Sequence, residues 1–242
     1  MSTVVVKFGT AVLFKDEGFV KAAPQIIQLM KEGVRIVVVS SGSIEAGRER
    51  LLELGRNAKE VSDKTLASLG SRVLLNRWSE VLSPFTDVGQ LWLTYGNWQD
   101  RGEKTSIERE IQNLLRCLLV PLINENDVVS DAELVQYQMG IGENDRLARM
   151  VAELVKADSI LFLTEAGGVY GENTLLQELT VQVASRILPW EITSQQGRGG
   201  MPKKVEEALM CARKGMRVAI AGLTEDSIIR FVHGEHVGTI VV

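Results

Sequence analysis

The sequence is poor in the residues that most often build metal and redox sites, with two histidines and two cysteines in 242 residues. Cys117 and Cys211 lack the C-x-x-C spacing of a redox or zinc motif, so we interpret them as reduced core thiols of a cytoplasmic protein. His233 and His236 have H-x-x-H spacing, but we identify no further ligands to accompany them. We therefore expect surface histidines and no metal-binding side chains.

Long apolar runs and an excess of positive charge are also missing. No segment approaches the roughly 18 apolar residues that a membrane-spanning helix needs, and Lys7 interrupts the first apolar run before a signal peptide could form. The net charge of -4 argues against a protein that binds nucleic acid mainly through its phosphates. We expect neither a membrane nor a nucleic-acid partner, while a local pocket for anions remains compatible with this charge.

Several phosphate-binding and catalytic motifs are absent. The sequence contains no Gly-Lys dipeptide, which excludes a Walker P-loop, and no G-x-G-x-x-G fingerprint of a dinucleotide-binding fold. The catalytic-loop signature of protein kinases and the G-x-S-x-G nucleophile motif are missing as well. Any phosphate chemistry in this chain must therefore rest on other residues.

What the sequence does contain is a regular alternation of short β-branched runs and amphipathic stretches. This pattern predicts an α/β fold, a three-layer sandwich with a mostly parallel central sheet covered by helices on both faces. No linker, low-complexity tract or internal repeat divides the chain, so we expect one domain over residues 1–242. The expected strands are 3–8, 34–40, 88–94, 120–124, 159–163, 216–221 and 238–242. The expected helices are 19–31, one from residue 44, 59–82 with an interruption near Gly70, 105–118, 146–156, 205–214 and 224–231, with a hairpin or flap at 128–139.

Residues 140–145, Gly-Ile-Gly-Glu-Asn-Asp, stand where a helix is expected to begin. Glycine lets the backbone approach a ligand closely, and a carboxylate near a helix start remains ionised more readily. We hypothesise that Asp145 positions two distant lysines, Lys7 and Lys204, on a phosphoryl group in transfer. The alternative is that Asp145 only caps the helix.

Four polar residues, Lys7, Ser41, Asp127 and Thr164, stand at or just beyond the carboxyl ends of expected strands. Ligands gather at this edge of open parallel sheets. Phosphoryl transfer depends mainly on positioning and charge stabilisation, which lysines, backbone N–H groups and Mg²⁺ supply. A carboxylate acceptor, with a pKa near ~4, is already ionised and needs no general base, so the shortage of histidine favours it over an alcohol.

Six motifs together resemble the amino acid kinase family in their order and approximate spacing. The most specific are the Asn-Glu-Asn-Asp run at 124–127 and the Gly-Gly-Met-x-x-Lys run at 199–204. The resemblance covers essentially all 242 residues and is greatest to the members that phosphorylate glutamate. The six motifs are Val5-Val6-Lys7-Phe8-Gly9-Thr10, Val39-Ser40-Ser41-Gly42, Asn124-Glu125-Asn126-Asp127, Gly142-Glu143-Asn144-Asp145, Leu163-Thr164-Glu165 and Gly197-Arg198-Gly199-Gly200-Met201-Pro202-Lys203-Lys204.

The resemblance implies ATP-dependent phosphorylation of the L-glutamate side-chain carboxylate to L-glutamyl 5-phosphate, the first step of proline biosynthesis, with ATP as co-substrate and Mg²⁺. It implies that Lys7 and Lys204 stabilise the charge on the phosphoryl group and that Asp145 organises both lysines. It also implies a cytoplasmic homo-oligomer, a dimer or a tetramer, of the form without a C-terminal PUA domain.

The same resemblance assigns the two substrates to separate sets of residues. L-glutamate would be bound by Ser41, Asp127 and Asn144. The residues implied to contact the nucleotide are Lys7, Gly9, Thr164, Glu165, Arg198, Gly199, Gly200, Met201, Pro202, Lys203 and Lys204.

Two regions differ from the family pattern and leave other functions open. Residues 128–142 border the expected substrate site, so a related kinase for another small carboxylate or phosphate is an alternative, and inhibition by proline is undecided. Residues 171–178 and the loop that carries Arg198 and Lys203 differ in the nucleotide region, which leaves a non-catalytic amino-acid sensor on the same fold as a second alternative.

Overall fold

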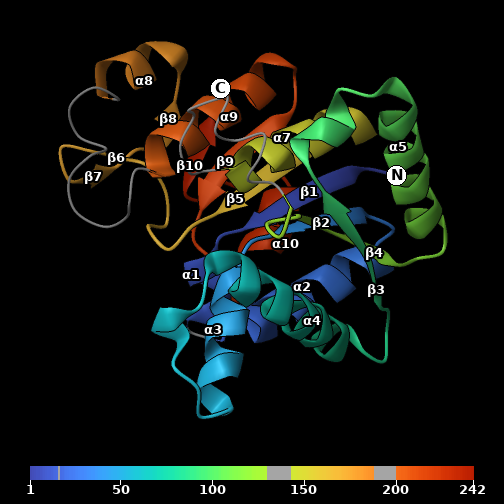
Figure 1. Ribbon diagram of the computed structural model, residues 1–242. Coiled ribbons are helices and arrows are strands. Elements are labelled where there is room, and N and C mark those ends of the chain that lie inside the picture. The colour runs from blue at the N-terminus through green and yellow to red at the C-terminus, as the bar shows by residue number, and fades with distance from the viewer. Residues whose placement is uncertain (16, 130–142, 188–199) are drawn as a thin grey trace.

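The computed structural model describes residues 1–242 except 16, 130–142 and 188–199, and in this part strands and helices alternate along the chain (Figure 1). The strands are β1 (Thr3–Phe8), β2 (Arg35–Ser40), β3 (Val88–Leu93), β4 (Val120–Glu125), β5 (Ser159–Leu163), β6 (Tyr170–Gly171), β7 (Thr174–Leu175), β8 (Glu178–Leu179), β9 (Arg217–Ala221) and β10 (Thr239–Val241). The α-helices are α1 (Thr10–Phe14), α2 (Gly18–Lys31), α3 (Ser43–Glu53), α4 (Asp63–Leu82), α5 (Arg101–Arg116), α7 (Glu143–Val155), α8 (Val181–Ile187), α9 (Gly200–Arg213) and α10 (Ser227–Val232). Two 3-10 helices, η1 (Ala58–Glu60) and η2 (Tyr95–Trp98), complete the described elements.

The central sheet runs in the order β3-β4-β2-β1-β5-β9-β10-β8. Neighbours are parallel from β3 to β9, and β10 pairs antiparallel with β9, so the predicted mostly parallel sheet is confirmed. In the register of β1, Lys7 stands opposite Val39 of β2 and Phe162 of β5. Lys7 therefore lies in the middle of the sheet, one residue before β1 ends.

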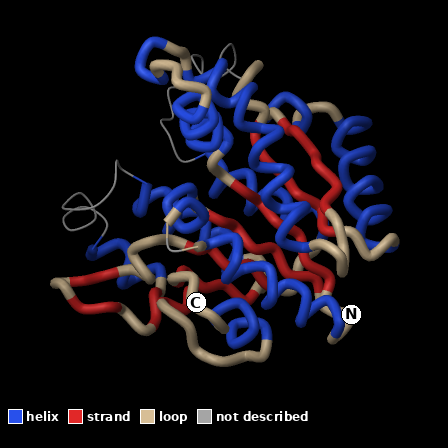
Figure 2. Tube along the Cα trace, turned by 90° about the horizontal axis from the view of Figure 1, so that it is seen from below, coloured by secondary structure: helices blue, strands red, loops and turns tan. Residues whose placement is uncertain are grey.

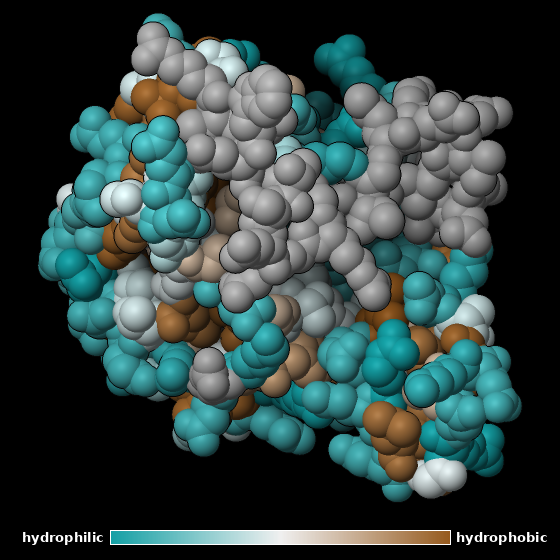
Figure 3. Space-filling view, turned by 90° about the vertical axis from the view of Figure 1, so that its left-hand side faces the viewer, coloured by the Kyte–Doolittle hydropathy of each residue, from teal (hydrophilic) through white to brown (hydrophobic). Residues whose placement is uncertain are grey.

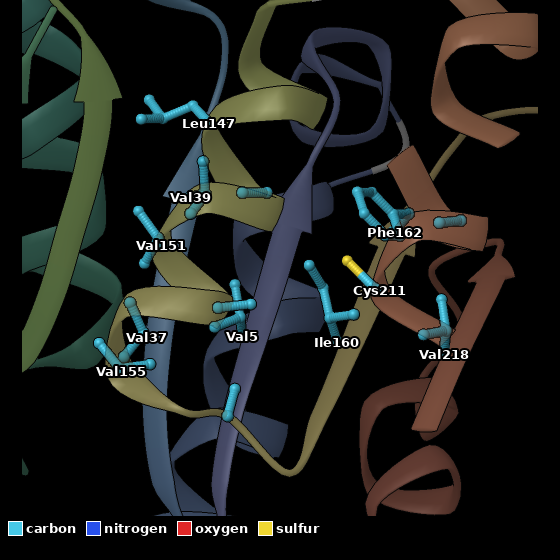
Figure 4. Packing of buried hydrophobic residues seen from close by; sticks show 14 of the residues in the cluster. Val5, Val37, Val39, Leu147, Val151, Val155, Ile160, Phe162, Cys211 and Val218 are labelled. Atoms are coloured by element: carbon cyan, nitrogen blue, oxygen red, sulfur yellow. The ribbon is translucent and has the colours of Figure 1, made fainter. Parts of the chain in front are cut away.

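The two faces of the sheet are covered by different helices, as the turned view in Figure 2 shows. Val5 points to the face covered by α5, α7 and α9, while Val4 and Val6 point to the face covered by α1, α2, α4 and α10. Figure 4 shows how Val151 of α7 and Cys211 of α9 approach the sheet from the first of these sides. Because both faces are buried, the central strands are largely apolar, and polar residues such as Lys7 of β1 and Ser40 of β2 stand near their ends.

Several helices begin at other residues than expected, for example α5 at Arg101 rather than 105 and α10 at Ser227 rather than 224. Two further differences concern α4 and α9. Helix α4 continues through Gly70 without the expected interruption. The glycine serves close packing instead, because a Cβ at this position would lie 1.8 Å from the carbonyl oxygen of Ser43. Gly70 is thus the place where α4 packs directly on the start of α3. Helix α9 begins at Gly200 rather than at residue 205, which places Lys204 inside a helix.

The large hydrophobic residues exposed on the described surface come from many different elements and loops. On the face drawn in Figure 3, most coloured atoms are hydrophilic and the hydrophobic ones are scattered. No described helix combines the length and the apolar character needed to cross a membrane. Cys211 is buried as expected, but the prediction of a buried Cys117 is wrong, because Cys117 follows the last turn of α5 and is exposed.

Both histidines are exposed, which confirms their expected place at the surface. His233 contacts Glu32 at 2.8 Å, and the ring of His236 contacts the carbonyl of Gly238. Of the hairpin or flap expected at 128–139, only residues 128 and 129 lie among the described residues.

Candidate active site

Three side chains that are far apart in the sequence meet at the carboxyl edge of the sheet. Lys7 comes from β1, Asp145 from the first turn of α7 and Lys204 from α9. The Nζ of Lys7 lies 2.7 Å from Oδ1 of Asp145, and the Nζ of Lys204 donates to both Oδ1 and Oδ2 at 2.8 Å. The predicted meeting of these three residues is confirmed by this geometry.

The three charges are almost completely withdrawn from solvent. The side chain of Asp145 is 5% exposed, that of Lys7 7% and that of Lys204 8%. Burial alone would raise the pKa of Asp145, but the ammonium groups of Lys7 and Lys204 hold it below its usual value, so the carboxyl stays ionised. Two cations against one anion leave a net positive charge in a site that water screens poorly.

The ammonium group of Lys204 is also strongly perturbed by its surroundings. Burial lowers the pKa of its ammonium group to about 8, and Lys7 acts in the same direction while Asp145 opposes both. Its Nζ also lies 5.8 Å from the centre of the Phe162 ring, over the aromatic face. An additional anion near Lys204 would relieve this perturbation, and a phosphoryl group is such an anion.

A second group of polar side chains lies in the loop between β2 and α3. Asn144 donates its side-chain amide to the hydroxyl of Ser41 at 2.9 Å, which joins the start of α7 to this loop. The carbonyl oxygen of the Asn144 side chain is buried and has no hydrogen-bond partner in the described structure. Buried acceptors are usually satisfied, so this atom is well suited to a donor from a ligand.

Asp127, the third predicted substrate residue, is held by a residue that sequence analysis did not single out. The hydroxyl of Ser43 donates to Oδ2 of Asp127 at 3.0 Å and accepts a hydrogen bond from the side chain of Asn124 at 3.3 Å. A cavity of about 300 Å³ opens beside them, with Ser68 of α4 and Trp92 of β3 also in its wall. The only sequence signals for Ser43 and Asn124 were that Ser43 follows the Val39-Ser40-Ser41-Gly42 motif and that Asn124 begins the Asn-Glu-Asn-Asp run.

The loop before α3 is shaped by a glycine in a conformation that other residues rarely adopt. Gly42 has a φ of 113°, and a Cβ at this position would lie 2.5 Å from Cε2 of Phe14. The Phe14 ring is itself covered by the guanidinium of Arg77, which Glu49 holds at 2.7 Å. The ring of Phe14 therefore fixes the backbone of the loop between Ser41 and Ser43 from behind.

Some of the residues predicted to contact a nucleotide are described in the structure, and these lie at the same edge of the sheet. The backbone N–H of Gly9 donates to Leu163, and that of Thr164 donates to Ala221, so both residues stand at strand ends. Glu165 forms an exposed ion pair with Lys15. Gly200, Met201, Pro202 and Lys203 make the first turn of α9, while Arg198 and Gly199 lie outside the described residues.

The described part of the chain contains no group of three histidine, cysteine or acidic residues arranged to hold a metal ion. Both oxygens of Asp145 are already occupied by ammonium groups. The residues present therefore fit a divalent ion that arrives with substrate phosphates, which is the usual manner of binding for Mg²⁺, better than a resident ion in a protein cage.

Comparison with known proteins agrees with this geometry. The model of the amino acid kinase family matches residues 2–222. The glutamate 5-kinase of Methanosarcina barkeri is 32% identical over 266 residues, which cover 99% of this chain and 68% of that protein. The glutamate 5-kinase of Photorhabdus laumondii is 34% identical over 253 residues, covering 98% of this chain and 67% of that protein.

Two solved structures share the fold. Uridylate kinase from Archaeoglobus fulgidus matches with a TM-score of 0.61 and 16% identity, over 100% of both chains. Carbamate kinase from Giardia lamblia, bound to AMP-PNP, matches with a TM-score of 0.65 and 15% identity, over 100% of this chain and 98% of that one. At these identities the likeness establishes the three-layer architecture and leaves the substrate open.

Proposed function

The chain belongs to the amino acid kinase family, and we propose that it transfers the γ-phosphoryl group of ATP to the side-chain carboxylate of L-glutamate. The products are L-glutamyl 5-phosphate and ADP, and the reaction is the first step of proline biosynthesis. The observation that carries the proposal is the pairing of Lys7 and Lys204 with one carboxylate, that of Asp145. Relatives named glutamate 5-kinase, aligned over nearly the whole chain, support the choice of acceptor.

The two lysines keep hydrogen-bond donors for the phosphoryl group while they hold Asp145. Each ammonium group has three N–H donors. Among the described residues, Lys7 contacts one oxygen of Asp145 and Lys204 contacts two, so these contacts leave each lysine at least one donor for another acceptor. These donors stabilise the negative charge on the equatorial oxygens during transfer, which is the main task of a phosphoryl-transfer site.

The acceptor needs no proton removed before it reacts. A side-chain carboxylate is ionised at neutral pH, so its oxygen attacks the γ-phosphorus as the bond from phosphorus to the ADP oxygen breaks. The difficulty is the repulsion between two anions, and the net positive charge of the buried site counters it. Consistent with this, His233 and His236 lie on the surface, at the end of the chain beyond α10.

Glutamate is bound between the loop before α3 and the end of β4 in this proposal. Asp127 receives the substrate ammonium group, and Ser41 and Asn144 contact its carboxylates. The cavity of about 300 Å³ beside Ser43 and Asp127 adjoins this position on the Asp127 side, while Ser41 and Asn144 are not part of its described lining. The free acceptor of Asn144 is available to the ammonium group as well.

ATP lies over the ends of β1 and β5 and over the start of α9 in the same proposal, and contacts Gly9, Thr164, Glu165 and residues 198–204. Mg²⁺ enters as part of the MgATP substrate and supplies further neutralisation of the phosphate charge. The N-terminal end of a helix such as α9 favours phosphate through its unpaired backbone N–H groups.

The direct test is to incubate the purified protein with ATP, Mg²⁺, L-glutamate and hydroxylamine, which traps an acyl phosphate as the hydroxamate. We expect hydroxamate that depends on glutamate and ATP, and none with L-glutamine, whose side chain is an amide in place of the acceptor carboxylate. A panel of other small carboxylates, together with carbamate and UMP, checks the alternative of a related kinase when the release of ADP is measured for each. Absence of glutamate-dependent hydroxamate, with ATP bound normally, would contradict the proposed acceptor.

Three further features belong to this proposal. Residues 1–242 form one amino acid kinase domain, the protein works in the cytoplasm, and it assembles as a homodimer or homotetramer. Light scattering after gel filtration measures the oligomeric state, and a monomeric mass at working concentrations would contradict that part.

A further inference from the structure

Helices α7 and α9, which deliver Asp145 and Lys204, are joined by further ion pairs below the site. Arg149 of α7 contacts Glu207 of α9 and, within its own helix, contacts Glu153 at 2.7 Å. Glu153 is in turn contacted at 3.4 Å by Lys214, which follows the last turn of α9. The three cross-helix pairs are Asp145–Lys204, Arg149–Glu207 and Glu153–Lys214, which we call the ion-pair ladder.

The signs of the ladder alternate on both sides. On α7 the charges run negative, positive, negative at positions four residues apart, which share one face of a helix. On the α9 side they run positive, negative, positive, at Lys204, Glu207 and Lys214. A slip of either helix by one turn, about 5.4 Å, would therefore place like charges opposite each other.

The ladder becomes more exposed with distance from the site. The side chains of Asp145 and Lys204 are 5% and 8% exposed, those of Arg149 and Glu207 are 16% and 15%, and that of Lys214 is 59%. Screening by water weakens exposed pairs, so the Lys214 pair contributes little. The Arg149–Glu207 pair is the one outside the catalytic group that is sufficiently buried to resist a slip of the helices.

We propose that Arg149 is a positioning residue, which through Glu207 sets the axial register of α9 against α7 and thereby holds Lys204 on Asp145. This inference rests on the proposed kinase activity for its catalytic consequence. A buried ion pair is weak evidence for stability, because desolvation offsets the attraction, and its best-established role is to specify one register among several. The apolar side of the two helices does not do this alone, since valine, leucine and alanine contacts such as those around Val151 tolerate small shifts.

The central test compares a broken pair with an apolar pair. In Arg149→Met, Glu207 is left as a partly buried charge without its cross-helix partner, and we expect both a lower melting temperature and a kcat lowered roughly 10- to 100-fold. In the double variant Arg149→Met/Glu207→Leu both charges are gone, so the melting temperature recovers while kcat stays low. Recovery of kcat together with stability would overturn the proposal, because the pair would then be only a structural support.

Two controls identify the reason for a change in kcat. Arg149→Lys retains the charge and is expected to restore most of the activity, whereas Arg230→Met breaks an exposed ion pair on α10 and should leave kcat unchanged. In a Lys204→Arg background, Arg149→Met is expected to lower kcat by a smaller factor than in the wild type, because both changes act on the same contact. An equal factor in the two backgrounds would contradict a route through Lys204.

A readout independent of turnover separates failure of this inference from failure of the proposed function. The side-chain ¹³Cε resonance of Lys204, assigned by its loss in Lys204→Arg, reports the titration of that ammonium group. We expect its midpoint to move in the double variant Arg149→Met/Glu207→Leu and to stay in place in Arg230→Met. An unmoved midpoint in the double variant overturns the inference whatever the substrate is, while a moved midpoint supports it even if glutamate is not the acceptor.

Discussion

Lys204 donates to both carboxylate oxygens of Asp145 at 2.8 Å, although 59 residues separate them in the sequence. Lys7 uses Oδ1 of the same carboxylate at 2.7 Å, so Asp145 binds two cations at once. This sharing keeps two ammonium groups close together in a buried place where they would otherwise repel each other. The chemical consequence is a site prepared for an anion before any ligand arrives.

Replacement of Asp145 is therefore expected to affect both folding and turnover. In Asp145→Asn the shape is conserved, but Lys7 and Lys204 lose their counter-ion, which we expect to lower the free energy of unfolding by about 3 kcal/mol. We also expect kcat to fall roughly 100-fold or more, because the two cations move apart. Chemical denaturation and steady-state kinetics measure the two effects, and Glu235→Gln, which removes an exposed partner of Arg230, serves as the control.

The activity should decline as the pH rises through about 8. The pKa of Lys204 is lowered to about 8, chiefly by burial, and the phosphoryl group requires the charged form. We expect kcat/KM, which reports the free enzyme, to decrease above this pH. The decrease of kcat should begin at a higher pH, because bound ATP favours the ammonium form of Lys204. Lys204→Arg, which stays charged, should have a lower rate that no longer decreases above about pH 8. If the same decrease persists in this variant, it belongs to the titration of another group.

The same group makes a defined contribution to the pH dependence of stability. The pKa of Lys204 lies at about 8 in the folded chain, against an ordinary value of 10.5, so the unfolded chain binds more protons between these values. Stability rises with pH wherever the unfolded state binds more protons. From this residue alone we expect the free energy of unfolding to increase between about pH 8 and 10.5. Urea unfolding of the wild type and of Lys204→Met at a series of pH values measures this contribution as the difference between the two proteins.

The loop that carries Ser41 is predicted to tolerate no side chain at Gly42. An alanine there has the cost of the left-handed backbone, about 1 to 2 kcal/mol, and its Cβ would also press on the Phe14 ring. Gly33→Ala is the matched control, because Gly33 has a φ of 85° but no atom within 4 Å of the added Cβ. We expect Gly42→Ala to raise the KM for glutamate and Gly33→Ala to leave it unchanged, although both lower the melting temperature.

The variant Gly42→Ala/Phe14→Leu separates backbone strain from the clash. If the ring is the obstacle, this double variant should regain part of the lost stability relative to Gly42→Ala. A KM for glutamate that is normal in Gly42→Ala would show that the loop does not depend on this contact.

Much of the fold was predictable because its signals are local. The buried strands of the sheet are short β-branched runs, and β5 has the bounds expected from the sequence, 159–163. The helix boundaries were less predictable where a tertiary contact decides them. Gly70 resembles a helix interruption in the sequence, yet α4 continues there. The glycine is needed for a tertiary contact, because a side chain would collide with the carbonyl of Ser43.

The same distinction holds in the site. Asp145, Lys7 and Lys204 could be named because each belongs to a recognisable motif at a strand or helix end. Ser43 was not singled out, because its role depends on Asp127, which is 84 residues away. Arg149 and Glu207 are 58 residues apart and belong to no motif, and only the four-residue spacing of charges on α7 hinted at them.

We predict that Ser43 orients Asp127 toward its proposed partner, the substrate ammonium group. Asp127→Asn removes the charge and is expected to raise the KM for glutamate roughly 100-fold, while kcat falls much less. Ser43→Ala retains the charge but removes the hydroxyl that holds Oδ2 at 3.0 Å, so we expect a smaller increase, of roughly 3- to 10-fold. The double variant should be no worse than Asp127→Asn, since Ser43 acts through that carboxylate. Initial rates over a range of glutamate concentrations at saturating ATP measure this order, and a Ser43→Ala variant with normal KM would remove Ser43 from the site.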